Sequence, residues 1–198
     1  MVTGSHIPED RNGIKYYKPD QELLKQDEDD VLASVRRVRE SVYASEDSRF
    51  SEAGMLIAAP KILVAKDVDV KRYERRFDLL TSGSPLKGVK IGVYEHSSVG
   101  RDLLCEVLES AGAEVLRYGR SKDFIPVDTE NVTRELTEKL AQYVQDGKLD
   151  ALVSLDGDAD RPLFVDEKGA VHSGDVLGLI TADLLKILPA PAMLTRLY

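Results

Sequence analysis

Apolar residues recur every three to four positions in two stretches of the first half of the chain, and this spacing predicts two amphipathic helices. The first covers residues 21–43, with valines at positions 31, 35, 38 and 42 on one face, and the second covers residues 68–82. Four acidic residues at 27–30 precede the arginines of the first helix. This polarity suits a helix dipole better than a metal site.

Residues 51–66 hold two short apolar runs, 55–57 and 62–64, with Pro60 between them. Proline interrupts both helices and sheets. The segment is therefore either two short strands or an irregular link.

Strand and helix patterns alternate in the second half of the chain. Strands are expected at 89–94, 113–118 and 151–155, with helices at 99–111 and 131–145 between them. A hairpin at 163–172 and a further helix from 173–175 onward follow. Such alternation predicts an α/β fold, with α/β/α layers around mixed, partly parallel sheets.

The composition excludes several classes of protein. The chain has 198 residues, of which 42% are hydrophobic and 31% charged, and its net charge is −8. An acidic chain without clustered cations argues against nucleic-acid binding, and no apolar run is long enough to span a membrane. The single cysteine, Cys105, excludes an internal disulfide and a cysteine-rich zinc site, which predicts a reducing cytoplasm.

Three carboxylates alternate with small residues directly after the strand expected at 151–155. They are Asp156, Asp158 and Asp160, and Arg161 follows them. In an extended chain they would share one face about 6.6 Å apart, and Gly157 lets the backbone curl so that their oxygens converge. Hard oxygen ligands favour Mg²⁺ or Ca²⁺, and without a cation three such close carboxylates would repel each other.

An EF-hand calcium loop is the rival interpretation of this segment. The three aspartates match its positions 1, 3 and 5, and Glu167 matches position 12. However, Arg161 stands where that loop needs glycine, and a strand rather than a helix precedes it. We therefore reject the EF-hand.

A second loop, near the start of the chain, carries Ser5 and His6 between Gly4 and Pro8, and Lys15 follows. Serine in such a loop is most often a turn former, although a nucleophile with cationic neighbours also fits. The Gly-x-Ser-x-Gly elbow of hydrolases is absent.

Residues 95–101 join a strand to a helix start, where backbone N–H groups can hold an anion. Because the Gly-x-Gly-x-x-Gly spacing is missing, we favour helix capping by Ser97 or Ser98. We interpret His172 as a hairpin residue and Cys105 as a core thiol.

The serine and aspartate loops together resemble the α-D-phosphohexomutase superfamily, the phosphomannomutase and phosphoglucomutase group. The resemblance rests on Thr3-Gly4-Ser5-His6-x-Pro8, Asn12-Gly13-x-Lys15 and Asp156-Gly157-Asp158-Ala159-Asp160-Arg161. It implies that residues 1–67 are the C-terminal part of domain I, 68–172 are domain II, and 173–198 begin domain III and end in an unmatched tail.

The resemblance also implies a chemistry. Ser5 would carry a phosphate and donate it to a hexose phosphate, giving a hexose 1,6-bisphosphate that reorients and returns its other phosphate. Mg²⁺ would be held by Asp156, Asp158, Asp160 and a phosphoserine oxygen at Ser5. His6 and Lys15 would be catalytic, with Lys15 handling the proton because a desolvated lysine beside cations can have a lowered pKa. Arg161 would bind substrate.

The chain departs from the family pattern in two respects. Ile7 stands where the family commonly has asparagine, which removes neither the nucleophile nor a metal ligand. The family's sugar-recognising loop, Gly-Glu-x-Ser-Gly, and its phosphate-binding loop, Arg-x-Ser-Gly-Thr, have no match. We therefore expect a truncated phosphohexomutase, and the alternative is a catalytically inactive fragment or interaction remnant.

Overall fold

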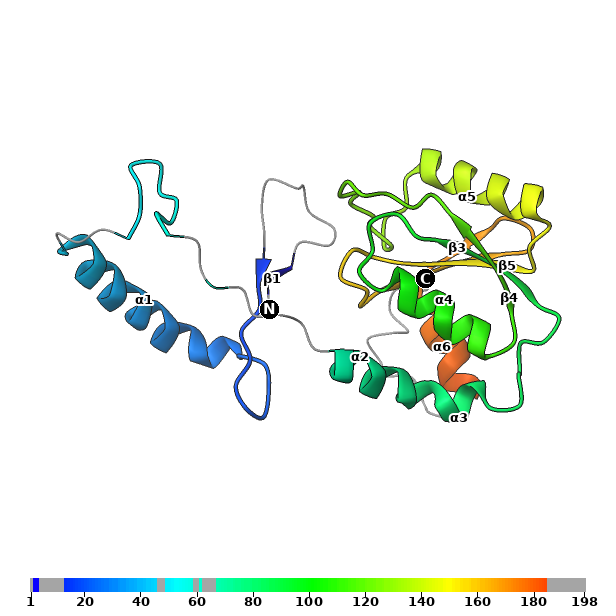
Figure 1. Cartoon of the computed structure of the whole chain (residues 1–198), viewed down its shortest axis with the longest axis horizontal. Coiled ribbons are helices and arrows are strands. Elements are labelled where there is room, and N and C mark those ends of the chain that lie inside the picture. The colour runs from blue at the N-terminus through cyan, green and yellow to red at the C-terminus, as the bar shows by residue number, and fades with distance from the viewer. Residues whose placement is uncertain (1, 4–12, 46–48, 59–60, 62–66, 185–198) are drawn as a thin grey trace. The chain divides into compact units, whose positions relative to one another are not determined.

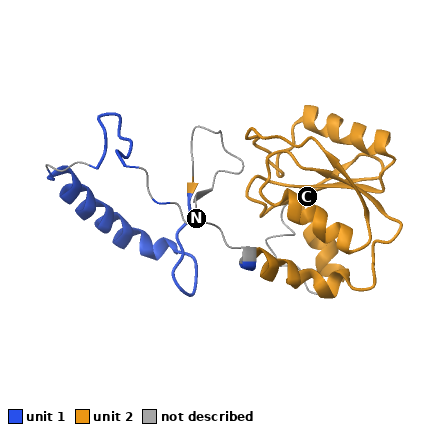
Figure 2. Cartoon of the chain, in the orientation of Figure 1, with its two compact units in different colours: residues 1–2, 14–68 blue, residues 3–13, 69–198 orange. Residues whose placement is uncertain are grey.

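A computed structural model describes residues 2–3, 13–45, 49–58, 61 and 67–184 (Figure 1). The chain divides into two compact units, residues 1–2 with 14–68 and residues 3–13 with 69–198 (Figure 2). Two short strands, β1 (Val2–Thr3) and β2 (Gly13–Ile14), pair with each other. The domain boundaries expected at 67/68 and 172/173 stay predictions.

The first unit is built around one long helix. A 3-10 turn, η1 (Lys25–Asp27), leads into α1 (Glu28–Tyr43), so the helix begins later than the predicted residue 21. The delay has a local cause, because the backbone N–H of Lys18 donates to the Gln21 carbonyl (2.7 Å) and turns the chain. Asp27 accepts hydrogen bonds from Leu24 N and Lys18 Nζ, both at 2.9 Å. As predicted, this acidic run belongs to the start of a helix.

The link expected at 51–66 is only partly described. Its first apolar run, 55–57, forms an isolated antiparallel bridge between Phe50 and Leu56 rather than a strand. The second run, 62–64, lies outside the described residues. The predicted helix at 68–82 is confirmed in three pieces, α2 (Asp67–Glu74), η2 (Arg75–Phe77) and α3 (Asp78–Thr81).

The second unit contains a five-stranded sheet with the order β4-β3-β5-β6-β7. Its strands are β3 (Lys90–Tyr94), β4 (Glu114–Tyr118), β5 (Ala151–Leu155), β6 (Pro162–Asp166) and β7 (Val171–His172). Strand β3 runs parallel to β4 and β5, whereas β6 is antiparallel to both β5 and β7. The predicted α/β fold with a mixed, partly parallel sheet is confirmed.

Helices cover both faces of this sheet. Helix α5 (Arg134–Gly147) lies on one face, while α4 (Arg101–Ser110) and α6 (Gly174–Leu184) lie on the other (Figure 1). Thr133 caps α5 by accepting a hydrogen bond from Leu136 N (3.3 Å), and Lys148 ends it in a left-handed conformation. None of the helices in the described ranges is long and apolar enough to cross a membrane.

The core of the second unit lies between α5 and the sheet. Fully buried side chains from the helix meet those of the central strands there; they are Tyr94, Val127, Leu140, Val144, Leu149, Leu152, Leu163 and Val165. On the other side of the sheet, Cys105 of α4 is completely buried, and burial raises the pKa of its thiol to about 11. Cys105 is thus a core thiol, as predicted. The sheet that carries the aspartate loop therefore has buried side chains against both of its faces.

Candidate functional site

The aspartate loop leaves the sheet at the point where the strand order reverses. From β3 the chain passes through α4 to β4 on one side, and later returns through α5 to β5 on the other side of β3. Because β3 and β5 are parallel, the loops after them emerge at the same edge. Ligand sites in open α/β sheets lie in the crevice outside such strand ends.

Three carboxylates converge in this loop. Asp156, Asp158 and Asp160 each offer an oxygen that lies within 4.8 Å of the others. Asp156 is completely buried, Asp158 is half-buried and Asp160 is exposed, so the group runs from the interior to the surface. The three aspartates therefore form an acidic group that could hold a metal ion.

Backbone hydrogen bonds hold this group together. The Oδ1 atom of Asp156 accepts hydrogen bonds from Asp160 N (3.0 Å) and Arg161 N (3.3 Å), and Asp156 N donates to the Arg161 carbonyl (3.0 Å). Ala159 takes a left-handed conformation with φ 66°, which turns the chain between the last two aspartates. The curl expected from Gly157 is thus completed by Ala159.

The donor set suits a hard divalent cation. Oxygens on opposite sides of one Ca²⁺ lie about 4.8 Å apart and those of one Mg²⁺ about 4.2 Å apart, so the aspartate group needs at most a small closure. All three donors are carboxylate oxygens, which favour these ions over zinc. The residues present therefore fit such an ion.

Arg161 lies beside these carboxylates. Its Nε atom is 3.8 Å from Asp160 Oδ1 and 4.0 Å from Asp156 Oδ2, and its Nη1 atom is 3.4 Å from Glu130 Oε1. Arg161, Asp160 and Glu130 line a small pocket of about 270 Å³ together with Thr129, Pro162 and Ser173–Asp175. The guanidinium therefore lies at the rim of the acidic group.

The loop after β3 packs directly against the aspartate loop. The imidazole of His96 is completely buried, and its Nε2–H donates to the carbonyl of Leu155, the residue before Asp156, at 2.7 Å. The backbone N–H of Val99 donates to the Gly157 carbonyl at 3.0 Å. Burial lowers the pKa of His96, so the ring is neutral at pH 7.

Gly100 makes this close approach possible. A Cβ atom at position 100 would lie 2.6 Å from Ala159 Cβ and 2.9 Å from Leu155 Cδ1. Both distances are shorter than any normal van der Waals contact, so only glycine fits here without a shift of the aspartate loop.

The predicted capping of α4 by Ser97 or Ser98 is wrong. Gly100 is the N-cap residue, and no side chain caps the helix. Ser97 Oγ instead donates to the Ile125 carbonyl (3.2 Å) and accepts from Ile125 N (2.8 Å). Ser97 therefore ties the loop after β3 to Ile125, and Ser98 Oγ accepts a hydrogen bond from Gly100 N (3.3 Å).

Glu95 anchors the other side of the same loop. Its carboxylate is almost completely buried and lies 2.8 Å from Arg120 and 3.5 Å from Arg117. Arg120 also pairs with Asp102 at 2.8 Å, and this hydrogen bond holds the pKa of Asp102 below its usual value. The ion pairs join α4 to β4 and the residues after it, which is a structural role.

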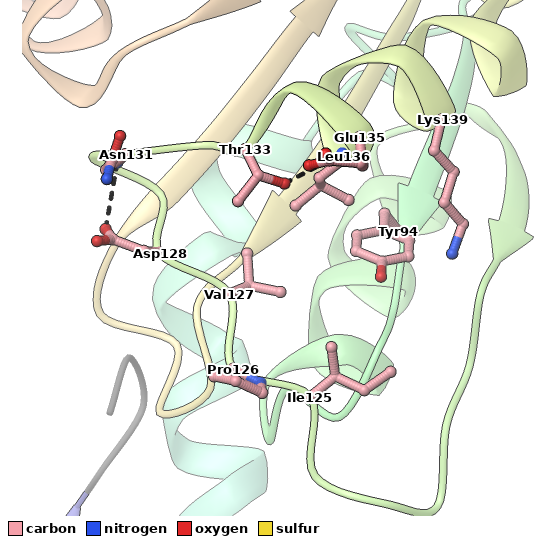
Figure 3. Close-up of a pocket in the computed structure, with 10 residues that line it drawn as sticks. All are labelled: Tyr94, Ile125, Pro126, Val127, Asp128, Asn131, Thr133, Glu135, Leu136 and Lys139. Carbon is pink, nitrogen blue, oxygen red and sulfur yellow. Dashed lines mark hydrogen bonds between the residues drawn. The ribbon is translucent and has the colours of Figure 1, made fainter. Parts of the chain in front are cut away.

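A larger groove, of about 380 Å³, lies beside α5 (Figure 3). Its lining includes Tyr94, Val127 and Leu136, and Lys139 Nζ lies 5.3 Å from the centre of the Tyr94 ring. None of the three aspartates lines it. The smaller pocket at Arg161 is therefore the one that belongs to the candidate site.

The structure does not relate three of the predicted site residues to the aspartates. Ser5 and His6 lie outside the described residues, and Lys15 follows β2 in the first unit. The roles of Ser5, His6, Lys15 and Arg161 stay predictions. Sequence reasoning did not connect His96, Gly100 and Glu130 to the aspartate loop.

Comparison with known proteins identifies the family. The sequence model for phosphoglucomutase/phosphomannomutase, alpha/beta/alpha domain II, matches residues 70–169. The chain belongs to the phosphoglucomutase/phosphomannomutase family. The matched range contains β3 to β6 and the whole aspartate loop.

Several relatives of this phosphoglucomutase/phosphomannomutase chain are known. A phosphomannomutase of Sinorhizobium fredii is 47% identical over 94% of the chain and 37% of its own length, and one of Salmonella muenchen is 40% identical over 91% and 34%. A phosphoglucosamine mutase of Symbiobacterium thermophilum is 30% identical over 94% and 39%. The chain thus spans well under half the length of these relatives.

A solved structure supports the fold. A phosphoglucomutase/phosphomannomutase family protein of Burkholderia thailandensis aligns with a TM-score of 0.60 and 18% identity. The alignment covers 93% of this chain and 37% of that one.

Proposed function

We propose that this chain carries the phosphoryl-transfer machinery of a phosphohexomutase, which moves phosphate between C1 and C6 of a hexose phosphate. The convergence of three aspartate oxygens at the carboxyl edge of the sheet supports the proposal most strongly. Family membership supports it further, because the relatives are named as phosphomannomutases and phosphoglucosamine mutases. Both names describe sugar-phosphate mutases.

In the proposed reaction, Ser5 carries the phosphoryl group. The bond between Ser5 Oγ and phosphorus breaks while a sugar hydroxyl forms a new bond to phosphorus, and Lys15 accepts the hydroxyl proton. The resulting hexose 1,6-bisphosphate reorients, and its other phosphoryl group returns to Ser5 as the proton returns to the sugar oxygen. One phosphoryl group is thus exchanged, and no other reactant is consumed.

The remaining residues stabilise charge in this reaction. Asp156, Asp158, Asp160 and a phosphoserine oxygen at Ser5 would hold Mg²⁺, which supplies neutralisation of the phosphoryl oxygens when bound. His6 adds positive charge beside the nucleophile, and Arg161 binds a substrate oxygen from the rim of the aspartate loop. A bidentate guanidinium suits a phosphate group well.

Uptake of phosphate by Ser5 tests the proposal. After incubation with a hexose 1,6-bisphosphate and Mg²⁺, intact-mass spectrometry should show a gain of one phosphoryl group. Ser5→Ala should abolish the gain, whereas Ser41→Ala, at an exposed position of α1, should keep it. No gain, or a gain that survives Ser5→Ala, would refute the phosphoserine.

A coupled mutase assay on the same chain separates the proposal from its alternative. Turnover of a hexose 1-phosphate supports a working mutase. Phosphorylation of Ser5 without turnover supports a catalytically inactive remnant of one.

A further inference from the structure

The guanidinium of Arg161 contacts carboxylates from two segments of the chain. Two of the three aspartates lie 3.8 Å and 4.0 Å from Nε, and Glu130 lies 3.4 Å from Nη1. The contact to Glu130 is the shortest of the three. Arg161 is therefore held from outside the aspartate loop as well as from within it.

Glu130 comes from the segment between β4 and α5, and its backbone is fixed. Asp128 Oδ1 accepts hydrogen bonds from Glu130 N (2.9 Å) and Asn131 N (3.3 Å), and the neighbouring Thr129 is buried. The carboxylate itself is 66% exposed and reaches Arg161 across the rim of the small pocket. A fixed backbone with a short reach to the guanidinium suits a residue that orients another.

A guanidinium this close to metal-ligating carboxylates competes with a cation for them. The guanidinium and the cation neutralise the same carboxylate oxygens. A cation therefore binds more tightly when the guanidinium also pairs with a carboxylate outside the metal site. Glu130 is such a partner, because it draws Arg161 toward the rim.

We propose that Glu130 is a positioning residue that keeps Arg161 at the rim of the aspartate loop and so weakens its competition with a metal ion for Asp156 and Asp160. The inference rests on the proposed metal site. Without Glu130, the metal ligands become the ion-pair partners of Arg161 at this rim. Metal affinity then falls although no metal ligand has changed.

The Mg²⁺ dissociation constant of the whole chain, measured by titration calorimetry, tests this inference. Glu130→Gln should raise the constant about two- to fivefold, a change in the range of an exposed ion pair. Glu138→Gln is the matched control, because Glu138 is 64% exposed and pairs with Arg134 at 2.7 Å within α5. It should leave Mg²⁺ affinity unchanged, and both variants should keep the thermal midpoint of the parent chain.

The same substitution in an Arg161→Gln background separates positioning from simple loss of negative charge. If Glu130 acts through Arg161, Glu130→Gln has no further effect there; an effect of the same size in both backgrounds overturns the inference. If Glu130→Gln in the parent chain leaves the Mg²⁺ dissociation constant unchanged, the inference is also overturned, but the proposed metal site is not. Failure of the parent chain to bind Mg²⁺ overturns the metal site and this inference together.

Discussion

His96 shows how one residue can support a candidate metal site without being one of its carboxylates. Its ring is completely buried, and burial lowers its pKa, so it acts as a neutral hydrogen-bond donor. The accepting carbonyl belongs to Leu155, which directly precedes Asp156. The imidazole therefore fixes the backbone from which the buried carboxylate of Asp156 projects.

Replacing His96 should be costly. His96→Ala removes the shorter of the two hydrogen bonds to the Leu155 carbonyl, leaving that from Ser154 Oγ at 3.3 Å, and opens a cavity, so we expect a loss of about 2–4 kcal/mol in unfolding free energy. Urea titration followed by circular dichroism measures this. His172→Ala is the control, since His172 is 35% exposed and pairs with Asp166 at 3.0 Å; it should cost about 1 kcal/mol or less. Equal losses would contradict the special role of His96.

The aspartates themselves could be predicted at the residue scale. Asp156, Asp158 and Asp160 are separated by single residues, so a short turn alone brings their oxygens together. Their convergence depends on local backbone geometry, and the spacing of the three aspartates along the sequence is enough to predict it.

At the scale of elements, the contact between the start of α4 and the aspartate loop organises the site. Gly100 has no room for a side chain, because Ala159 and Leu155 lie against it. The segment 95–101 was predicted to cap a helix, and it instead packs against the loop after β5. The start of α4 thus packs against the aspartate loop and limits its conformation.

Gly100→Ala should disturb the packing of α4 against the aspartate loop. The added methyl group must push the aspartate loop away, which should cost about 1–3 kcal/mol of unfolding free energy and weaken Mg²⁺ binding. Gly174→Ala, at the start of α6, is matched to it because nothing lies within 4 Å of its Cβ position. Gly174→Ala should leave the free energy of unfolding nearly unchanged. Urea unfolding of both variants and calorimetric Mg²⁺ titration of Gly100→Ala check the prediction, and an equal loss of stability in the two variants would contradict it.

At the scale of the whole molecule, ion pairs make the fold sensitive to acid. Hydrogen bonds from Arg120, His172 and Lys18 hold the pKa values of Asp102, Asp166 and Asp27 below their usual range. Such a carboxylate stabilises the folded state above its unfolded pKa, and the contribution is lost as the pH falls through the folded pKa. The pair of Lys18 with Asp27 lies within the first unit, and the other two pairs lie within the second.

We therefore expect the urea midpoint to fall steeply below about pH 4. Asp102→Asn removes one of the carboxylates with a lowered pKa and should flatten part of this acid slope. Asp123→Asn, an exposed aspartate in the segment after β4, should leave the slope unchanged. A slope that is the same in all three chains would show that the Asp102 pair does not contribute.

The order of elements also followed from the sequence. The alternation of strands and helices from 89 to 155 and the hairpin after it come from local periodicity, and they agree with the structure to within a few residues. The start of α1 was missed because hydrogen bonds among residues 16–23 turn the chain before the helix begins. Periodicity does not detect such a turn.

By itself, the sequence determined the α/β fold, the family and the three converging aspartates, because periodicity and short motifs, each made of neighbouring residues, carry them. Only the tertiary structure decided which other residues surround them. Parallel pairing of β3 with β5 brings His96 and Gly100 to the aspartate loop, and the segment before α5 brings Glu130 to Arg161. These partners are far apart in sequence and meet at one edge of a sheet, so no spacing along the chain could reveal them.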